Sequence, residues 1–225
     1  MKTAQLESIE NVFTMLEQIE PRWIDISGLT CSGKSTLLHS IISKFKVNAI
    51  REDHPQPTVE IFDRFGQNKN SDWQTEASRM EEYFTLLERK VKAGVNFNAP
   101  IVIGMEHHPE LCNSTSNPLQ VRKTILNVLL QQKKEIMLVS THQYCLDEAV
   151  LGLLGTSKAI EQLAFNIVLG DSALKLARQS WKKDAHNDWF EWLKAQKYPC
   201  VVSGCGRSVQ PAILPTKRYR DFFNC

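Results

Sequence analysis

One stretch of eight residues restricts the fold of this chain more than any other feature. Residues 28–35 read Gly-Leu-Thr-Cys-Ser-Gly-Lys-Ser and match the phosphate-binding pattern G-x-x-x-x-G-K-[ST]. Residues 23–27 before it are predicted to form a short strand, and residues 36–45 after it have the apolar spacing of a helix. A strand, a tight turn and a helix start are the context in which this pattern binds phosphate. The sequence therefore predicts an α/β fold built around a phosphate site.

Each position of this loop has a predicted role in holding a nucleotide. Gly28 and Gly33 allow a turn tight enough for successive backbone N–H groups to converge on phosphate oxygens. Lys34 is expected to reach the β- and γ-phosphates, and the Ser35 hydroxyl is expected to bind Mg²⁺. The predicted nucleotide-binding residues are Gly28, Thr30, Cys31, Ser32, Gly33, Lys34, Ser35 and Thr36. ATP is the expected ligand, and Mg²⁺ is the expected cofactor.

Length and composition are those of one globular domain. The chain has 225 residues, of which 42% are hydrophobic and 23% are charged. No apolar run approaches the ~20 residues that span a membrane, and the first residues lack the apolar core of a signal peptide. The six cysteines include no C-x-x-C pair, so reduced thiols are expected. We therefore expect a cytoplasmic protein without a membrane anchor.

The predicted elements divide the chain into three parts. Residues 1–20 are expected to form an amphipathic helix that packs on the core and ends before Pro21. Residues 21–215 are expected to form the domain that carries the phosphate loop, and residues 216–225 are a basic, aromatic tail. The net charge of +2 neither requires nor excludes an anionic polymer as a partner.

Strands and helices are predicted to alternate between residues 21 and 215. The predicted strands are 23–27, 47–50, 58–62, 99–105, 135–140, 164–169 and a terminal hairpin of 200–203 with 208–214. The predicted helices are 36–45, 73–91, 117–132, a stretch that runs through 154–162, and 171–196. Continuous apolar strands are typical of a parallel sheet that is buried on both faces. The pattern thus predicts a three-layer α/β fold, with a mainly parallel central sheet flanked by helices.

Polar residues end two of the buried strands. In phosphate-loop enzymes the strand beside the loop ends in an acid that orients Mg²⁺ or the attacking water, and Glu106 follows strand 99–105 directly. His142 and Gln143 follow strand 135–140, at the edge where ligands of open α/β sheets bind. Either side chain is placed to sense the γ-phosphate, and an ordinary loop role fits equally well. The predicted catalytic residues are Lys34, Glu106 and Gln143, and the predicted metal-binding residues are Ser35 and Glu106.

Three other polar residues are weaker site candidates. Asp63 follows strand 58–62, where it either faces the nucleotide or caps a turn, and the turn is favoured. The adjacent His107 and His108 point in different directions and have no third ligand at a suitable spacing. These histidines are therefore expected to be solvated loop residues.

The order of these parts resembles the FtsK–HerA superfamily of DNA-pumping ATPases. Residues 26–36 look like that family's loop, and residues 79–90 look like the helix before its second motif. Residues 101–106 are similar to its hydrophobic strand ending in Asp-Glu, and residues 138–143 to the strand whose terminal glutamine links the ATP state to DNA contact. The resemblance covers about residues 23–215. It implies a RecA/FtsK-like fold and a homo-hexameric ring whose pore grips double-stranded DNA.

Two positions depart from the pattern of that family. Met105 stands where the family has an aspartate that coordinates the Mg²⁺ shell, which leaves Glu106 as the only acid. Gln131-Gln132 stands where the family has an arginine before the sensor strand. An arginine acting on a neighbouring subunit must then come from elsewhere, and the candidates are Arg122, Arg178 and Arg207. Hydrolysis is expected to be slow.

Two other functions remain compatible with the same loop. Residues 26–28 and 32–36 also look like the loop of uridine kinase, which implies a small kinase that phosphorylates a nucleoside. Such enzymes close an arginine-bearing lid over the phosphates, whereas Arg178 and Arg207 are isolated in this sequence. The third possibility is a nucleotide-switched binding module, in which Met105 has weakened catalysis.

Overall fold

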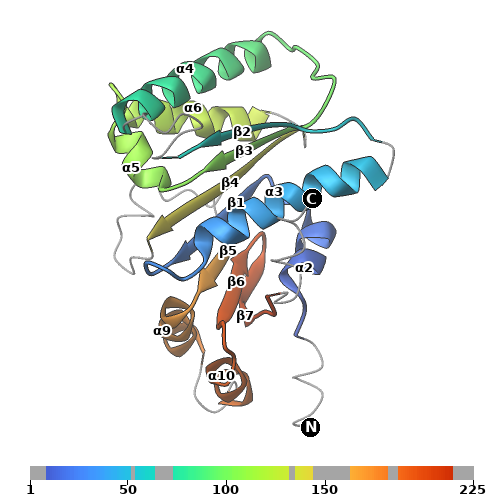
Figure 1. The fold of residues 1–225 in the computed structure, drawn as a ribbon, viewed down its shortest axis with the longest axis vertical. Coiled ribbons are helices and arrows are strands. Elements are labelled where there is room, and N and C mark those ends of the chain that lie inside the picture. Colours follow the sequence, from blue (N-terminus) through green and yellow to red (C-terminus); the bar gives the residue numbers. More distant parts are fainter. Residues whose placement is uncertain are drawn as a thin grey trace.

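The computed structural model describes residues 9–51, 54–63, 73–131, 135–143, 163–181 and 187–214. Its centre is a seven-stranded sheet with the strand order β2-β3-β4-β1-β5-β6-β7 (Figure 1). The strands are β1 (Trp23–Gly28), β2 (Thr58–Phe62), β3 (Ile101–Met105), β4 (Ile136–Gln143), β5 (Ala164–Leu169), β6 (Cys200–Gly204) and β7 (Arg207–Pro211). The first five strands of the chain pair in parallel, whereas β6 and β7 are antiparallel.

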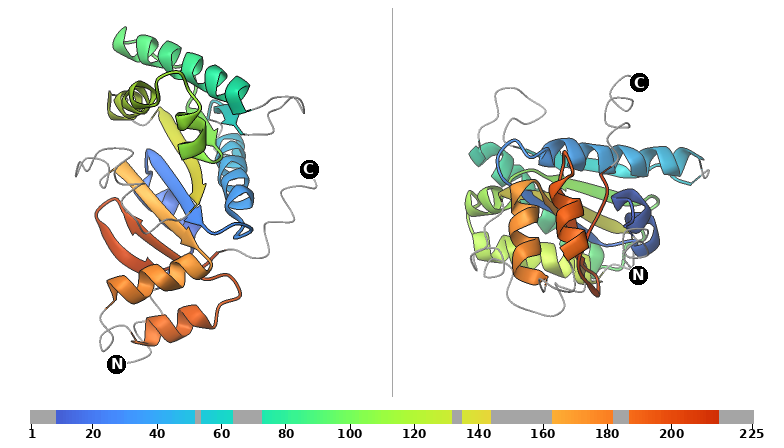
Figure 2. Two further views of the ribbon diagram at one scale, coloured as in Figure 1. Left: turned by 90° about the vertical axis from the view of Figure 1, so that its left-hand side faces the viewer. Right: turned by 90° about the horizontal axis from the view of Figure 1, so that it is seen from below.

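Helices cover both faces of this sheet. They are α2 (Val12–Ile19), α3 (Lys34–Arg51), α4 (Trp73–Lys92), α5 (His108–Asn113), α6 (Pro118–Gln131), α9 (Asp171–Ser180) and α10 (Asn187–Lys194). Helices α2 and α3 pack on one face, whereas α5, α6 and α9 lie on the other, and α4 packs against α6 (Figures 1 and 2). The predicted three-layer α/β fold with a mainly parallel sheet is confirmed. Within the described ranges, no helix is both long enough and apolar enough to cross a membrane.

Strand β1 lies at the centre of the core and is buried along its whole length. Ile24 and Ile26 face α3 and pack in one cluster with Leu37 and Leu38. Trp23 points to the opposite face and packs in a second cluster with residues of α4, α5 and α6. Because both faces are covered, a strand can be apolar at successive positions, which explains the continuous apolar runs in the sequence.

The predicted strand at residues 47–50 was wrong. These residues form the last turns of α3, which runs without a break from Lys34 to Arg51. Phe45 packs against the core cluster on this face, while Ile50 remains 60% exposed. Burial therefore follows the helical period here, because packing of α3 on the sheet overrides the local preference of Val47 and Ile50 for a strand.

The single helix predicted at residues 171–196 was also wrong, since the chain forms α9 and α10 there. Helix α9 ends at Ser180, and Trp181 has an extended backbone with φ −98° and ψ 132°. The Trp181 indole nitrogen donates a hydrogen bond to the carbonyl oxygen of Val209 on β7, at 2.8 Å, and its ring contacts Trp189. This anchor to β7 ends α9. Trp189 and Trp192 pack against the apolar cluster that contains Trp181, so these tryptophans have a structural role.

Several predictions fall outside the described residues. They concern residues 1–8, the helical stretch through 154–162 and the basic tail at 216–225. The other predicted strands and helices are present with shifts of a few residues at their ends.

Gly204, at the end of β6, provides a test of how closely the antiparallel strand β6 packs on β5. Its φ is +91°, and an added Cβ would lie 2.1 Å from the carbonyl oxygen of Ala164. We expect Gly204→Ala to lower the free energy of unfolding by about 2–4 kcal/mol, because it adds a backbone clash to an unfavourable φ. Urea unfolding followed by tryptophan fluorescence measures this loss.

The matched control is Gly206 in the same turn. Its φ is +81°, but an added Cβ would have no atom within 4 Å. Gly206→Ala should therefore cost only the about 1–2 kcal/mol of a left-handed backbone. Equal losses in the two variants would contradict the close packing of β6 on β5.

Candidate nucleotide site

The phosphate loop joins the carboxyl end of β1 to the start of α3, as predicted. Gly28 is the last residue of β1, and an added Cβ there would lie 2.5 Å from Ser32 Oγ and 3.1 Å from the carbonyl oxygen of Leu169. The absence of a side chain at Gly28 thus lets the loop fold back over the strand end. Cys31 has a left-handed backbone with φ +63°, which turns the chain toward α3. The strand, loop and helix predicted from the motif are confirmed.

Lys34 lies inside the loop and is only 9% exposed. Its ammonium group donates to the carbonyl oxygens of Gly28, at 3.0 Å, and Leu29, at 2.7 Å. Burial lowers the pKa of Lys34, against the opposing effect of the nearby Cys31 and Glu106. The lysine therefore occupies the hollow of its own loop, close to where a phosphate group would sit.

The loop contains a buried polar atom that suits a phosphate ligand. Ser32 Oγ is buried and has no hydrogen-bond partner within the described part of the chain. Burial of an unpaired hydroxyl is unfavourable, and a phosphate oxygen would accept a hydrogen bond from it. Together with Lys34 and the N-terminus of α3, Ser32 makes this loop chemically suited to a nucleotide phosphate.

Glu106 reaches the phosphate loop although its strand does not adjoin β1. The Ser35 hydroxyl donates to Glu106 Oε2 at 3.1 Å, and His39 Nε2 lies 3.2 Å from Glu106 Oε1. The hydrogen bond from His39 lowers the pKa of Glu106, and the bond from Ser35 acts in the same direction. The contact with Glu106 raises the pKa of His39. Glu106 is thus held as a carboxylate beside Ser35.

The expectation that the acid-bearing strand lies beside the loop strand was wrong. β4 lies between β1 and β3 in the sheet. Glu106 follows β3, and its backbone nitrogen donates to the carbonyl oxygen of Phe62 at 2.9 Å. The next residue, His107, is tied to β4, because its backbone nitrogen donates to Thr141 Oγ1 at 3.1 Å. The end of β4 therefore lies between the phosphate loop and the turn that carries Glu106.

His142 and Gln143 lie at the end of β4, inside the strand rather than after it. The register aligns His142 with Ser27 and Gln143 with Gly28. His142 is only 5% exposed, while Gln143 is exposed. The strand thus brings the predicted residue Gln143 next to the first glycine of the loop, and it buries the neighbouring histidine.

The buried His142 is paired with Asp25 of β1. His142 Nδ1 lies 3.2 Å from each carboxylate oxygen of Asp25. The Ser140 hydroxyl donates to Asp25 Oδ1 at 2.6 Å and accepts a hydrogen bond from the Trp23 indole at 2.8 Å. Burial lowers the pKa of His142, but the charge and hydrogen bond of Asp25 and the charge of Glu110 together outweigh it, and the net shift is upward. The pair therefore favours an imidazolium beside the carboxylate.

Sequence reasoning missed Asp25 and His39 as parts of this site. A signal for Asp25 was available, because a carboxylate inside a strand expected to be buried must find a partner. His39 lies one turn after Ser35 on the predicted helix and so shares its face. Nothing in the sequence indicated that this face meets Glu106.

Met105 and the three candidate arginines make other contacts within the described part of the chain, and the role of the arginines on a neighbouring subunit stays a prediction. Met105 is fully buried in the core cluster with α4 and α6, so it is a packing residue. Arg122 donates to Asn113 and Arg207 to Gln18, while the Arg178 guanidinium lies over the Phe190 ring.

The sequence favoured a turn-capping role for Asp63, but the structure places this residue near the nucleotide site. Its charge helps to raise the pKa of His39, and its Oδ1 is buried without a hydrogen-bond partner in the described ranges. In those ranges no cluster of three or more His, Cys, Asp or Glu side chains could hold a metal ion. A Mg²⁺ ion at Ser35 and Glu106 would therefore take its remaining ligands from phosphate and water, as Mg²⁺ commonly does.

The sheet, the loop between β1 and α3 and the carboxylate beside Ser35 define the fold of a P-loop NTPase. No family model matches the sequence, and no curated protein matches it.

Solved structures with a similar arrangement of the chain have little sequence identity to it. A KaiC-like protein from the archaeon Pyrococcus horikoshii is 13% identical, with 84% of this chain and 83% of that chain covered and a TM-score of 0.45. Caenorhabditis elegans PCH-2 is 10% identical, with 84% and 48% covered and a TM-score of 0.42. A structure described as an ATPase is 12% identical, with 91% and 85% covered and a TM-score of 0.48.

The Asp25–His142 pair predicts a specific change in titration. In Asp25→Asn we expect the pKa of His142 to fall, because burial then acts without the opposing carboxylate. A raised pKa in the folded state stabilises the protein below the unfolded value of about 6.5, and this contribution is lost as the pH rises through the folded pKa. The stability difference between wild type and Asp25→Asn should therefore shrink as the pH rises.

Proton NMR titration of the histidine rings measures the pKa, and His142→Gln assigns the resonance. Ser140→Ala is the matched control, because it removes a neutral hydrogen bond to Asp25 and leaves the charge. An unchanged His142 titration in Asp25→Asn would contradict the pairing.

Proposed function

We propose that this chain is an ATP-binding and hydrolysing motor of the FtsK–HerA type that moves or packages double-stranded DNA as a ring-shaped homo-oligomer, most simply a hexamer. The observation that carries the ATPase part is the contact between Ser35 and Glu106, at 3.1 Å, beside the buried Lys34. The DNA and ring parts rest on the resemblance in motif order. In this proposal, residues 21–215 form the motor, residues 1–20 support its core, and residues 216–225 are an appended tail.

In this proposal each residue of the site has a separate role in ATP hydrolysis. Lys34 exchanges the carbonyl oxygens of Gly28 and Leu29 for the β- and γ-phosphates of ATP. Ser35 and Glu106 would hold Mg²⁺, which would supply neutralisation of charge on the phosphates. Glu106 orients and polarises the attacking water, for which it must be ionised, and its lowered pKa keeps it so. Positioning and electrostatic stabilisation supply most of the rate in phosphoryl transfer.

His39 restrains the same carboxylate. Its imidazole occupies Glu106 Oε1, while Ser35 occupies Oε2. Each carboxylate oxygen can accept a further interaction, so His39 and Ser35 orient Glu106 and still leave it lone pairs for water or Mg²⁺.

Gln143 reports the nucleotide state in this mechanism. It is paired with Gly28, the first residue of the loop, in the register of β4 and β1. The buried Asp25–His142 pair is a positioning device that fastens the end of β4 to β1. In the ring, the arginine that completes each site would come from the neighbouring subunit, with Arg122, Arg178 and Arg207 as the candidates.

Glu106→Gln tests the catalytic assignment. We expect ATP turnover to fall about 10²–10³-fold, because the amide cannot polarise water as a carboxylate does. Affinity for a fluorescent ATP analogue should stay nearly unchanged, whereas Lys34→Ala should abolish binding. Glu82→Gln on the exposed side of α4 is the control for loss of a carboxylate. Normal turnover in Glu106→Gln, with none in Lys34→Ala, would remove Glu106 from the mechanism.

Turnover with and without double-stranded DNA tests the motor. We expect stimulation at about 50 mM salt that weakens toward about 200 mM, because phosphate contacts release counterions. Native mass spectrometry with an ATP analogue should show a ring-sized oligomer. Turnover that requires an added nucleoside would instead indicate a kinase, and tight ATP binding with negligible turnover would indicate a binding module.

A further inference from the structure

Asp63 carries a buried carboxylate oxygen that the mechanism above does not use. Its Oδ1 is buried and has no hydrogen-bond partner within the described part of the chain. A carboxylate oxygen loses its hydration on burial, and this loss is unfavourable unless a donor replaces the water. A buried polar atom of this kind often marks the place of a bound ion or water.

The pairing of β2 with β3 places Asp63 beside Glu106. The two strands are parallel, with Phe62 opposite Met105, and each acid is the next residue after its strand. The Glu106 backbone nitrogen donates to the carbonyl oxygen of Phe62 at 2.9 Å and so holds the two strand ends together. Because adjacent strands lie about 4.8 Å apart, the two acids leave the sheet from neighbouring positions. They do so at its carboxyl edge, where the phosphate loop also lies.

Both carboxylates act on the same imidazole of α3. His39 Nε2 lies 3.2 Å from Glu106 Oε1. The hydrogen bond to Glu106 is the main cause of the raised pKa of His39, burial opposes it, and the charge of Asp63 adds to it. Asp63 is therefore near the turn of α3 that carries Ser35 and His39.

The donor set at this edge favours an indirect contact between Asp63 and a metal ion. In the described ranges, no three His, Cys, Asp or Glu side chains are placed to hold one ion. Met105 is fully buried, and its soft sulfur does not suit Mg²⁺, which prefers oxygen ligands. Mg²⁺ usually keeps several waters, and carboxylates that do not bind a metal directly often orient its ligands. Asp63 fits this outer role.

We propose that Asp63 is an outer carboxylate of the Mg²⁺ site, whose Oδ1 accepts a hydrogen bond from a water that binds the ion. This inference rests on the proposed function, in which Ser35 and Glu106 bind the ion directly. Asp63 is then a positioning residue, and its negative charge strengthens binding of the cation. The buried oxygen gains its missing donor when the metal binds.

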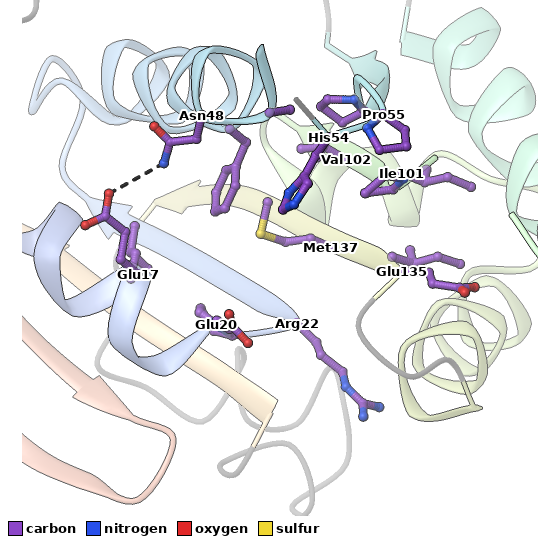
Figure 3. Close-up of a pocket in the computed structure, with 17 residues that line it drawn as sticks. Glu17, Glu20, Arg22, Asn48, His54, Pro55, Ile101, Val102, Glu135 and Met137 are labelled. Atoms are coloured by element: carbon purple, nitrogen blue, oxygen red, sulfur yellow. Dashed lines mark hydrogen bonds between the residues drawn. The ribbon is translucent and has the colours of Figure 1, made fainter. Parts of the chain in front are cut away.

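A carboxylate at the other end of the sheet supplies the matched control. Figure 3 shows Glu135 at the margin of a pocket that is lined by Ile101 and Ile136, the first residues of β3 and β4. Glu135 directly precedes β4, whereas Glu106 directly follows β3, so the two lie at opposite ends of parallel strands. Glu135→Gln therefore removes a carboxylate far from the phosphate loop.

Titration with Mn²⁺ in place of Mg²⁺ tests the proposal, with free Mn²⁺ measured by electron paramagnetic resonance. The whole chain is kept in excess over a non-hydrolysable ATP analogue, so that no free nucleotide competes for the ion. Asp63→Asn should weaken Mn²⁺ binding about tenfold, because loss of an outer partner typically costs a metal site at least that much affinity. Asp63→Glu should retain more of the affinity than Asp63→Asn, and Glu135→Gln should match the wild type.

Stability without metal separates this role from a structural one. In EDTA, Asp63→Asn should be no less stable than the wild type in urea unfolding, because it removes a buried charge whose Oδ1 has no donor. Its affinity for the analogue in EDTA should also be unchanged. A loss of stability in EDTA would contradict the outer role and make Asp63 a structural residue.

The same titration separates failure of this inference from failure of the proposed function. Mn²⁺ binding that is equal in the wild type and Asp63→Asn would overturn the role of Asp63 alone. No nucleotide-dependent Mn²⁺ binding by the wild type would overturn the metal site and this inference together. Reduced ATP turnover in Asp63→Asn at unchanged Mn²⁺ affinity would also overturn the proposal, and it would assign Asp63 to the attacking water.

Discussion

The buried carboxylate of Asp25 is the constraint on which the arrangement at the phosphate loop depends. An unpaired charge inside the sheet would cost several kcal/mol, so β1 requires a neighbour that supplies a hydrogen-bond donor and a cation. β4 supplies both, as Ser140 and His142. The residues of β4 face Asp25 only if β4 pairs directly with β1 in the observed register, because a one-residue slip would turn both away. This pairing also sets β3 one strand further from the loop.

Much of the fold and part of the site could be predicted from the sequence. The motif at residues 28–35 is a local pattern, and the buried strands are continuous apolar runs, so both follow from neighbouring residues. The order of strands in the sheet depends on contacts between distant residues, and β4 was therefore not foreseen between β1 and β3. The same holds for His39, whose partner Glu106 lies 67 residues away in the sequence. The errors at 47–50 and 171–196 arose where tertiary packing decided how far a helix extends.

The site places opposite charges close together. Lys34 is held by the carbonyl oxygens of its own loop, and Glu106 is held by Ser35 and His39. These contacts satisfy groups that would otherwise be buried and unpaired. They also fix the positions of Lys34 and Glu106 relative to the phosphate loop.

Helix α3 has a mechanical consequence that follows from its length. Its 18 residues extend for about 27 Å as one rigid rod, from Lys34 at the phosphate loop to the opposite edge of the sheet. A tilt of α3 by only about 5° at the loop would move its last turn by about 2 Å. This displacement is more than half the distance between successive residues along a β-strand. A tilt of α3 too small to alter the packing at the phosphates would thus produce a larger displacement further along the helix. This displacement would be largest at the amino-terminal ends of the parallel strands.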